Sequence, residues 1–173
     1  MGLQAISTGS APRPRTLSVA ALALALLALV AHADPKLLPP QEAFRFSARA
    51  LDDRTLEARF SVTDGYYLYR DKMKFALDPG MNEIAVVLPP GKLKEDQFFG
   101  KVETYRGEVV VRVPLAEAAA GKPVVLVADS QGCADAGVCY PATRQKVTLA
   151  VPEPGKGPGP VVEAVPRKKN WFN

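Results

Sequence analysis

The chain has 173 residues, of which 47% are hydrophobic, and this length supports one domain with a hydrophobic core. Its 22 basic and 18 acidic residues give a formal net charge of +4 at pH 7. This small positive excess argues against a nucleic-acid-binding protein.

Residues 1–33 have the layout of a secretory signal peptide. Two arginines precede an apolar run over residues 17–30, which is short for a membrane anchor, and Ala31-His32-Ala33 is suited to cleavage. We therefore expect an exported protein that begins near Asp34 and has no membrane span. Cleavage would leave a net charge of +2 and remove the only histidine, which excludes histidine-based catalysis and zinc ligation in the mature chain.

Residues 44–62 alternate apolar and polar side chains on both sides of Leu51-Asp52-Asp53-Arg54. This period of two with a polar turn predicts a β-hairpin. Turns rich in Gly and Pro separate six further predicted strands, at residues 66–70, 73–77, 84–88, 108–113, 124–128 and 145–151. Short strands at this spacing, without a long amphipathic helix, predict an antiparallel β-sandwich of immunoglobulin type. Residues 115–120 could form one helical turn.

The composition changes after Val151. Residues 152–160 consist mainly of Pro and Gly, which sustain neither strand nor helix, so residues 152–173 are expected to be a linker or disordered tail. The expected organisation is a signal peptide over residues 1–33, one domain over residues 34–151, and this tail.

The only two cysteines are Cys133 and Cys139, and the five-residue gap between them differs from the Cys-x-x-Cys of thioredoxin. Export favours a disulfide between them, and Gly132 and Gly137 allow the positive φ that would fold the loop back. A structural staple is the simplest explanation. However, a ring of about seven residues gains only about 2.4 kcal/mol on the chain-entropy model. A short loop near the surface also favours exchange with other thiols, and the spacing alone leaves both interpretations open.

Three stretches resemble the periplasmic N-terminal domain of the DsbD family of thiol:disulfide interchange proteins. They are residues 64–70 (DGYYLYR), 95–101 (EDQFFGK) and 131–141 (QGCADAGVCYP), and the likeness runs in the same order from about residue 40 to about 151. The resemblance implies an immunoglobulin-like, periplasmic protein-disulfide reductase without a cofactor. Its disulfide would be reduced by a thioredoxin-like donor domain and would in turn reduce oxidised thioredoxin-fold proteins, namely disulfide isomerases and cytochrome c maturation factors.

The family's membrane domain and C-terminal thioredoxin-like domain have no counterpart in this sequence. The donor would therefore belong to another chain, unless the sequence is a truncated or split gene product.

The resemblance also implies roles for single residues. Cys139 would form the mixed disulfide with a partner, and Cys133 would resolve it. A cap loop would shield the pair, with Phe98 over the sulfurs; its residues are Asp96, Gln97, Phe98, Phe99 and Gly100. Phe99 stands where the family often has tyrosine, so no hydroxyl is available at that position. From the dipeptide alone, ordinary core packing is the favoured explanation of Phe98 and Phe99, and only their position within the resembling stretch favours the cap instead.

Tyr67 and Tyr69 alternate along a predicted strand, which would place both rings on one face, beside the cysteines according to the resemblance. Their hydroxyls could hydrogen-bond the site, or the rings could simply pack in the sandwich. Asp96 and Asp135 are expected to be solvated acids in loops. Near a cysteine, the negative charge of either would disfavour the thiolate, and Arg144 is the only obvious positive charge that could offset it.

The main alternative is a non-enzymatic β-sandwich that binds a periplasmic partner and carries a structural disulfide. Copper binding by the two thiolates has little support without histidine, so no metal is expected.

Overall fold

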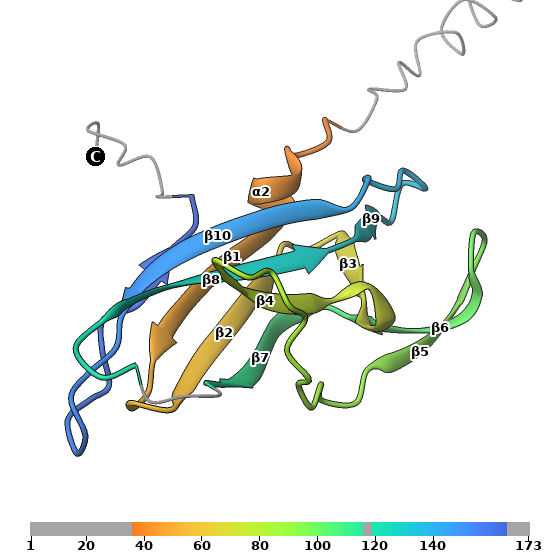
Figure 1. Cartoon of the computed structure of the whole chain (residues 1–173). Helices are drawn as coiled ribbons and strands as arrows, with labels where there is room; N and C mark the ends of the chain where they lie inside the picture. The colour runs from red at the N-terminus through yellow and green to blue at the C-terminus, as the bar shows by residue number, and fades with distance from the viewer. Residues whose placement is uncertain (1–35, 116–118, 166–173) are drawn as a thin grey trace, which may run out of the picture. The chain divides into compact units, whose positions relative to one another are not determined.

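A computed structural model describes residues 36–115 and 119–165 (Figure 1). The expected signal peptide, residues 116–118 of the possible helical turn over residues 115–120, and the end of the tail lie outside the described residues. The described helices are two short pieces, α2 (Pro40–Ala43) and the 3-10 helix η2 (Arg70–Lys72). Among the described residues no helix has the length and hydrophobicity that a membrane span requires.

The alternating segment forms the hairpin that the sequence predicts. β1 (Phe44–Ala50) and β2 (Thr55–Val62) pair antiparallel, from Phe44 opposite Val62 to Ala50 opposite Leu56. β7 (Gly107–Pro114) pairs with the free edge of β2, and β11 (Val162–Glu163) pairs with β1, which gives the order β11-β1-β2-β7. Alternate side chains of β1, β2 and β7 are buried, so one face of this sheet contacts the core.

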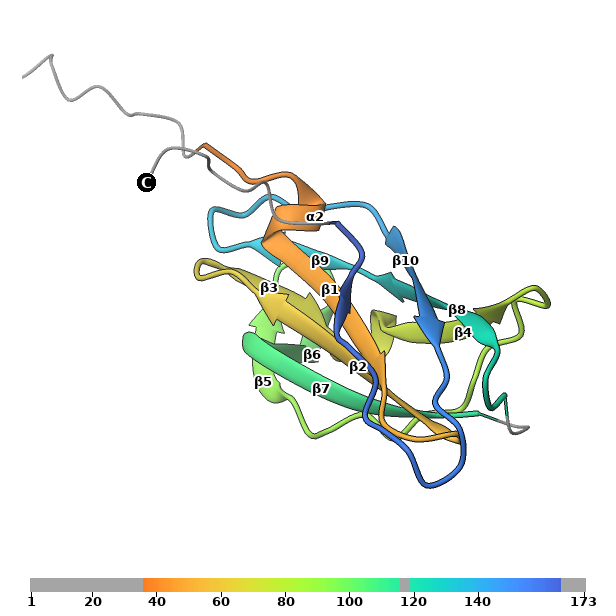
Figure 2. The same ribbon diagram turned by 90° about the vertical axis from the view of Figure 1, so that its left-hand side faces the viewer.

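A second sheet has the order β10-β8-β4 and is formed by β10 (Thr143–Ala150), β8 (Pro123–Ser130) and β4 (Lys74–Asp78). In Figure 1 its strands cross those of the first sheet, and Figure 2 shows the arrangement from the side. One apolar cluster joins the two sheets; its largest fully buried side chains include Phe44, Phe46, Phe60, Phe75, Leu126 and Leu149. The predicted antiparallel β-sandwich of immunoglobulin type is therefore confirmed.

A third sheet extends from the sandwich and has the order β5-β6-β3-β9. β3 (Tyr66–Tyr69) follows β2 after a tight turn, and β9 (Gly132–Ala134) follows β8 after Gln131. These continuations of sandwich strands pair with each other. β5 (Lys92–Asp96) and β6 (Gly100–Tyr105) form a hairpin that joins the sheet through β3 and projects to the right in Figure 1. This sheet carries Cys133 on β9 and the predicted cap loop between β5 and β6, and Cys139 lies opposite Cys133 in an isolated β-bridge.

The strand predicted at residues 84–88 is wrong. The carbonyl oxygens of Leu88 and Pro89 accept hydrogen bonds from the Arg70 guanidinium, at 3.1 and 2.9 Å, and Pro89 also accepts one from the Tyr105 hydroxyl. Side chains thus satisfy backbone groups that a strand would pair with a neighbouring strand. Conversely, β5, β6 and β9 were not predicted.

Residues 152–161 contain neither helix nor strand, as their composition predicts. They are nevertheless no free linker, because the Gly159 amide donates to the Ala50 carbonyl at 2.8 Å and the Ala164 amide donates to that of Phe46 at 3.0 Å. Between these bonds lies β11. The expectation of a linker or disordered tail is wrong as far as residue 165, because the open edge of β1 offers backbone groups for pairing.

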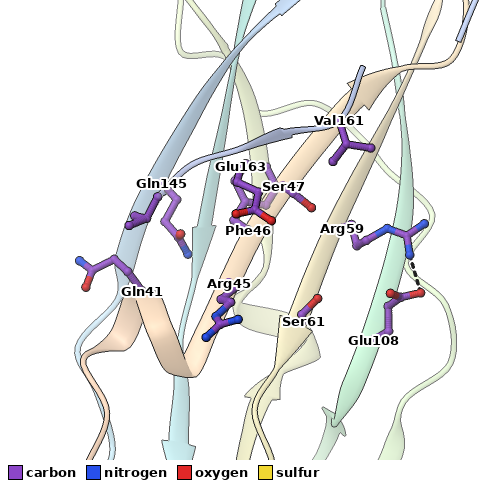
Figure 3. A pocket seen from close by; sticks show the side chains of 11 residues that line it. Gln41, Arg45, Phe46, Ser47, Arg59, Ser61, Glu108, Gln145, Val161 and Glu163 are labelled. Carbon is purple, nitrogen blue, oxygen red and sulfur yellow. Dashed lines mark ion pairs between the residues drawn. The ribbon is translucent and has the colours of Figure 1, made fainter. Parts of the chain in front are cut away.

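A cleft lies between β11 and the outer face of β1 and β2 (Figure 3). Its lining is mainly polar and includes Arg45, Ser61 and an ion pair between Arg59 and Glu108. None of its lining residues belongs to the cysteine loop or to the β5–β6 hairpin.

Candidate functional site

Cys133 and Cys139 form the predicted disulfide. The two residues face each other across an antiparallel β-bridge, so the loop between them is a small hairpin. Its backbone hydrogen bonds run from the Ala134 amide to the Val138 carbonyl, at 2.8 Å, and from the Tyr140 amide to the Gly132 carbonyl, at 3.0 Å. We call residues 132–140 the cysteine hairpin. This backbone pairing places the two cysteines directly opposite each other.

The two glycines of the cysteine hairpin serve different purposes. Gly137 has φ 83°, as the predicted turn requires. The expectation of a positive φ at Gly132 is wrong. A Cβ atom there would collide with the Tyr67 carbonyl oxygen and lie 2.7 Å from Cζ of Phe44, so close packing against β3 requires the glycine.

The two sulfur-bearing residues differ in exposure. Cys133 is completely buried, whereas Cys139 is half-buried. Both pack with Tyr67, Tyr69 and Val102 in a small apolar cluster that is separate from the main core. An attacking thiol therefore meets the sulfur of Cys139 more easily than that of Cys133.

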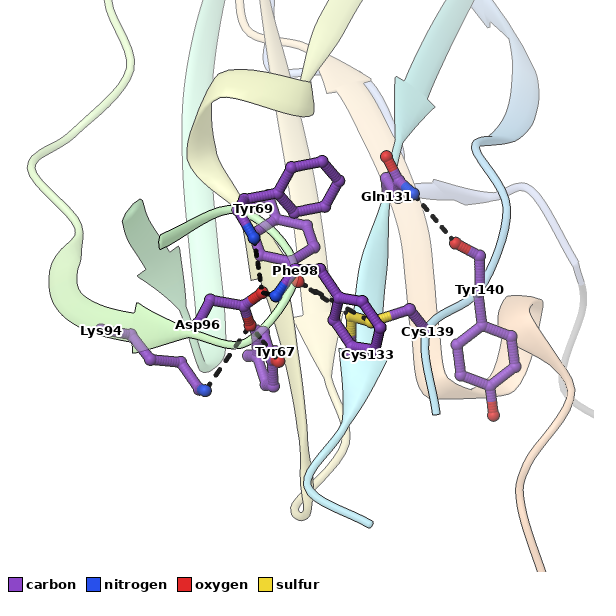
Figure 4. The surroundings of a disulfide bond; sticks show 10 residues. Tyr67, Tyr69, Lys94, Asp96, Phe98, Gln131, Cys133, Cys139 and Tyr140 are labelled. Carbon is purple, nitrogen blue, oxygen red and sulfur yellow. Dashed lines mark hydrogen bonds and ion pairs between the residues drawn. A yellow bond between two sulfur atoms is a disulfide. The ribbon is translucent and has the colours of Figure 1, made fainter. Parts of the chain in front are cut away.

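The Tyr69 hydroxyl points at the disulfide (Figure 4). Its oxygen lies 3.1 Å from Sγ of Cys133 and 3.7 Å from Sγ of Cys139. Burial, reinforced by the neighbouring Tyr67 hydroxyl, raises the pKa of Tyr69. The hydroxyl therefore keeps its proton and can donate a hydrogen bond to sulfur.

The Asp96 carboxylate is the centre of the predicted cap loop, and its side chain is fully buried. It accepts hydrogen bonds from the Tyr67 hydroxyl at 2.7 Å and from the amides of Phe98 and Phe99 at 2.9 and 3.3 Å. Burial works to raise the pKa of Asp96, but these hydrogen bonds outweigh it and lower the pKa to about 2. The expectation of a solvated loop acid is therefore wrong for Asp96.

The cap loop is the tip of the β5–β6 hairpin. Gln97, Phe98 and Phe99 connect Asp96 to its strand partner Gly100, which has φ 70°. Phe98 is 54% exposed and Phe99 is 46% exposed, so the core-packing explanation is wrong for both.

The two rings at this tip have different surroundings. The Phe99 ring packs edge-on against Tyr69, with centroids 5.1 Å apart, and the Lys72 ammonium lies 5.0 Å from the Phe99 centroid. In Figure 4 the Phe98 ring is drawn in front of the two sulfurs.

Asp135 lies at the turn of the cysteine hairpin and is paired. Its carboxylate accepts two hydrogen bonds from Arg106, at 2.9 and 2.6 Å, and this pair lowers the pKa of Asp135. Arg144, the counterweight that the sequence suggested, instead forms a two-fold hydrogen bond with Asp129, so this expectation is wrong.

Sequence reasoning missed the cations that contact this site. The Arg106 guanidinium lies 5.3 Å, and the Lys94 ammonium 4.7 Å, from the centroid of the Tyr67 ring. It also missed Tyr140, whose hydroxyl donates to the Leu38 carbonyl at 2.7 Å. None of them has a local signal in the sequence, because the contacts depend on tertiary structure. Within residues 36–115 and 119–165, no cluster of three or more His, Cys, Asp or Glu could hold a metal ion.

The sequence model of one family, "Thiol:disulfide interchange protein DsbD, N-terminal", matches residues 34–151. The DsbD protein of Ralstonia nicotianae is 47% identical over 143 residues, which cover 79% of this chain and 23% of that protein. The Escherichia coli DsbD protein is 39% identical over 114 residues, covering 65% and 19%. The chain thus spans less than a quarter of the length of these relatives.

Two solved structures from Neisseria meningitidis are similar to this chain. The reduced DsbD N-terminal domain has a TM-score of 0.62 and 34% identity, covering 73% of this chain and 94% of that one. The DsbD N-terminal domain in complex with the PilB N-terminal domain has a TM-score of 0.55 and 35% identity, covering 70% and 95%. The sandwich, the cysteine hairpin and the match over residues 34–151 agree: the chain belongs to the family of DsbD N-terminal domains.

Proposed function

We propose that this domain transfers electrons between proteins outside the cytoplasm by thiol:disulfide exchange at Cys133 and Cys139. The observation that carries the proposal is the asymmetry of the disulfide, since one sulfur-bearing residue is buried and the other half-buried in a hairpin that extends from the sandwich. A bond that only staples the fold has no need of an accessible sulfur.

Exchange proceeds in two balanced steps in each direction. A donor thiolate attacks Sγ of Cys139, the disulfide breaks, and the electron pair leaves on the Cys133 sulfur, which takes a proton. The donor's second thiolate then attacks its own sulfur in the mixed disulfide and releases the Cys139 thiolate. The domain is now a dithiol, and the donor has become a disulfide.

The recipient reverses these roles. The Cys139 thiolate attacks the recipient's disulfide, and the recipient's second sulfur leaves with the electron pair. The Cys133 thiol then loses its proton and attacks Sγ of Cys139, and the recipient leaves as a dithiol once both of its sulfurs have taken a proton. Two electrons and two protons pass to the recipient, and the domain returns to the disulfide.

The Tyr69 hydroxyl supports this assignment of roles. It lies closer to Cys133 than to Cys139, at 3.1 against 3.7 Å, so it donates best to the sulfur that must leave as a thiolate. A hydrogen bond to a charged acceptor is stronger than one to a neutral acceptor. The contact therefore favours attack at Cys139.

The tip of the β5–β6 hairpin, residues 97–99, acts as a cap over the pair in this proposal. The buried Asp96 carboxylate fixes the amides of Phe98 and Phe99, and the exposed Phe98 ring, drawn in front of the two sulfurs in Figure 4, would cover them. An aromatic cover excludes water and small oxidants, whereas a docking partner can displace it.

The partners remain part of the proposal. We infer a thioredoxin-like donor on another chain or domain, and recipients of the thioredoxin fold that include disulfide isomerases and cytochrome c maturation factors. A solved complex of a related DsbD N-terminal domain with the PilB N-terminal domain supports binding to another protein domain. The signal-like residues 1–33 support a periplasmic location.

Trapping of mixed disulfides tests the proposal. The Cys133→Ala chain, expressed in the periplasm, should accumulate disulfide-linked thioredoxin-fold proteins, because Cys139 can attack but nothing resolves the product. The Cys139→Ala chain is the matched control and should trap none. A pattern with the two variants exchanged would reverse the roles of the cysteines. No trapping by either variant, with a disulfide potential below about −300 mV, would instead indicate a structural bond.

A further inference from the structure

Arg106 lies between β6 and β7 and contacts both parts of the redox site. Its guanidinium donates two hydrogen bonds to Asp135, at the turn of the cysteine hairpin, and one to the Tyr66 carbonyl at 3.2 Å. The same group lies over the ring of Tyr67, whose hydroxyl binds the Asp96 carboxylate beneath the cap.

The turn of the cysteine hairpin is fixed from two sides. The Asp135 amide donates to the Gly65 carbonyl at 2.7 Å, in the turn between β2 and β3, and the Asp135 carboxylate binds Arg106. The hairpin is therefore attached to the sheet by contacts that do not involve sulfur. They remain available after the disulfide has been reduced.

We propose that Arg106 is a positioning residue for the exchange reaction, which holds the cysteine hairpin closed so that the two thiols stay adjacent in the reduced domain. We call the ion pair between Arg106 and Asp135 the clamp, and we infer that it helps to set the reduction potential of the disulfide. The biological meaning of this inference rests on the proposed function.

The direction of the effect follows from coupling between the clamp and the disulfide. The oxidised hairpin is always closed, whereas the reduced hairpin divides its time between closed and open forms. The clamp therefore stabilises the disulfide state more than the dithiol state, and it raises the effective concentration of Cys133 at Cys139. Without it the disulfide becomes easier to reduce, and Cys133 resolves a mixed disulfide more slowly.

The first test is the equilibrium of the disulfide with dithiothreitol in the full chain. For Arg106→Gln we expect a three- to fivefold smaller constant for disulfide formation, within the range of exposed ion pairs, or a potential higher by about 14 to 21 mV at 29.6 mV per tenfold. Asp135→Asn should give the same shift, the double variant no more than either, and Arg106→Lys a smaller one.

Arg144→Gln is the matched control. It breaks an equally exposed, two-fold hydrogen-bonded Arg–Asp pair, with Asp129, that joins β8 to β10. It should leave the equilibrium unchanged. A shift in Arg106→Gln no larger than in this control, or one that Asp135→Asn does not reproduce, overturns the inference.

The second test follows the reduced domain with oxidised glutathione. Cys139 attacks one glutathione sulfur and releases a glutathione thiolate, then Cys133 attacks Cys139 and releases the second. Acid quenching and mass spectrometry should find more of the Cys139–glutathione adduct in Arg106→Gln than in the wild type. An equal amount contradicts the clamp. Both tests use small thiols, so they decide this inference even where trapping finds no protein partner and the proposed function fails.

Discussion

Removal of the Phe98 ring should speed the reduction of the disulfide by a small thiol. Phe98 is 54% exposed, so just under half of its surface is removed from water. Complete burial of such a side chain is worth about 1.5 to 3 kcal/mol, which makes closure of the Phe98 ring worth about 0.7 to 1.4 kcal/mol. In Phe98→Ala the cap should therefore open about three- to tenfold more often, since 1.4 kcal/mol is a factor of ten.

The assay is the rate of reduction by dithiothreitol, measured under pseudo-first-order conditions. Leu93→Ala is the control, because Leu93 is an 82% exposed apolar residue on β5, in the same hairpin but outside its tip. The disulfide of Phe98→Ala should be reduced about three- to tenfold faster than that of the wild type, whereas Leu93→Ala should react at the wild-type rate.

The unfolding free energy of Phe98→Ala shows whether Phe98 is a cap residue or a core residue. Deletion of a core phenylalanine costs about 3 to 5 kcal/mol, whereas loss of a half-exposed ring should cost about 1 kcal/mol. An unchanged reduction rate together with the larger loss of unfolding free energy would make Phe98 a packing residue and refute the cap. The exchange chemistry at the cysteines would be unaffected by that result.

Three further predictions concern the same site. The Asp96 pKa of about 2 lies below its ordinary 3.8, so Asp96 contributes stability above pH 3.8 that is lost as the pH falls through about 2. Denaturant unfolding at pH 5 and pH 2.5 should show this loss in the wild type and a smaller one in Asp96→Asn. Gly132→Ala should lower the unfolding free energy more than Gly137→Ala, because a Cβ at Gly132 overpacks against backbone and a buried ring, whereas Gly137→Ala loses only the about 1 to 2 kcal/mol of its positive φ. Equal losses on thermal unfolding would contradict this distinction. Tyr69→Phe should slow reduction by dithiothreitol about tenfold, because a hydrogen bond of about 1.5 kcal/mol to the leaving Cys133 thiolate is lost; an unchanged rate would show that the hydroxyl only packs.

The sequence predicted strands well where one face is buried. The hairpin of residues 44–62 alternates because the sandwich buries every second side chain, and the structure confirms it. β5 gives no such signal. Leu93, its only strongly apolar residue, is 82% exposed, because this hairpin stands apart from the core and buries little of either face.

The opposite error occurred at residues 84–88, where an apolar run predicted a strand. Its length and composition fit a strand, but β-structure also requires a neighbour with free backbone groups. Arg70, from a distant part of the sequence, takes the carbonyl groups of Leu88 and Pro89 instead. Such competition depends on the tertiary fold and has no local signature.

For the site, the sequence identified the disulfide and the resemblance to the family supplied the cap. The counter-charge was predicted at Arg144 but lies at Arg106. Arg144 lies nearer to Asp135 along the chain, nine residues away against 29 for Arg106, but it pairs with Asp129 on the neighbouring strand. Only the pairing of β3 with β6 and β9 brings Arg106 to the cysteine hairpin.

Because the site lies outside the main core, the stability of the reduced chain can show whether the Cys133–Cys139 disulfide is redox-active or structural. Cys133 belongs to a small cluster with Tyr67 and Tyr69, outside the main core, and backbone hydrogen bonds hold the cysteine hairpin independently of its sulfurs. Reduction should therefore cost at most the roughly 2.4 kcal/mol of chain entropy for a ring of about seven residues. Denaturant unfolding of the oxidised and reduced chain measures the difference. A loss near 5 kcal/mol, or loss of the native β-sheet signal on reduction, would mean that the fold depends on the bond. A small loss is what repeated exchange requires, because the domain must remain folded as a dithiol in order to meet its next partner.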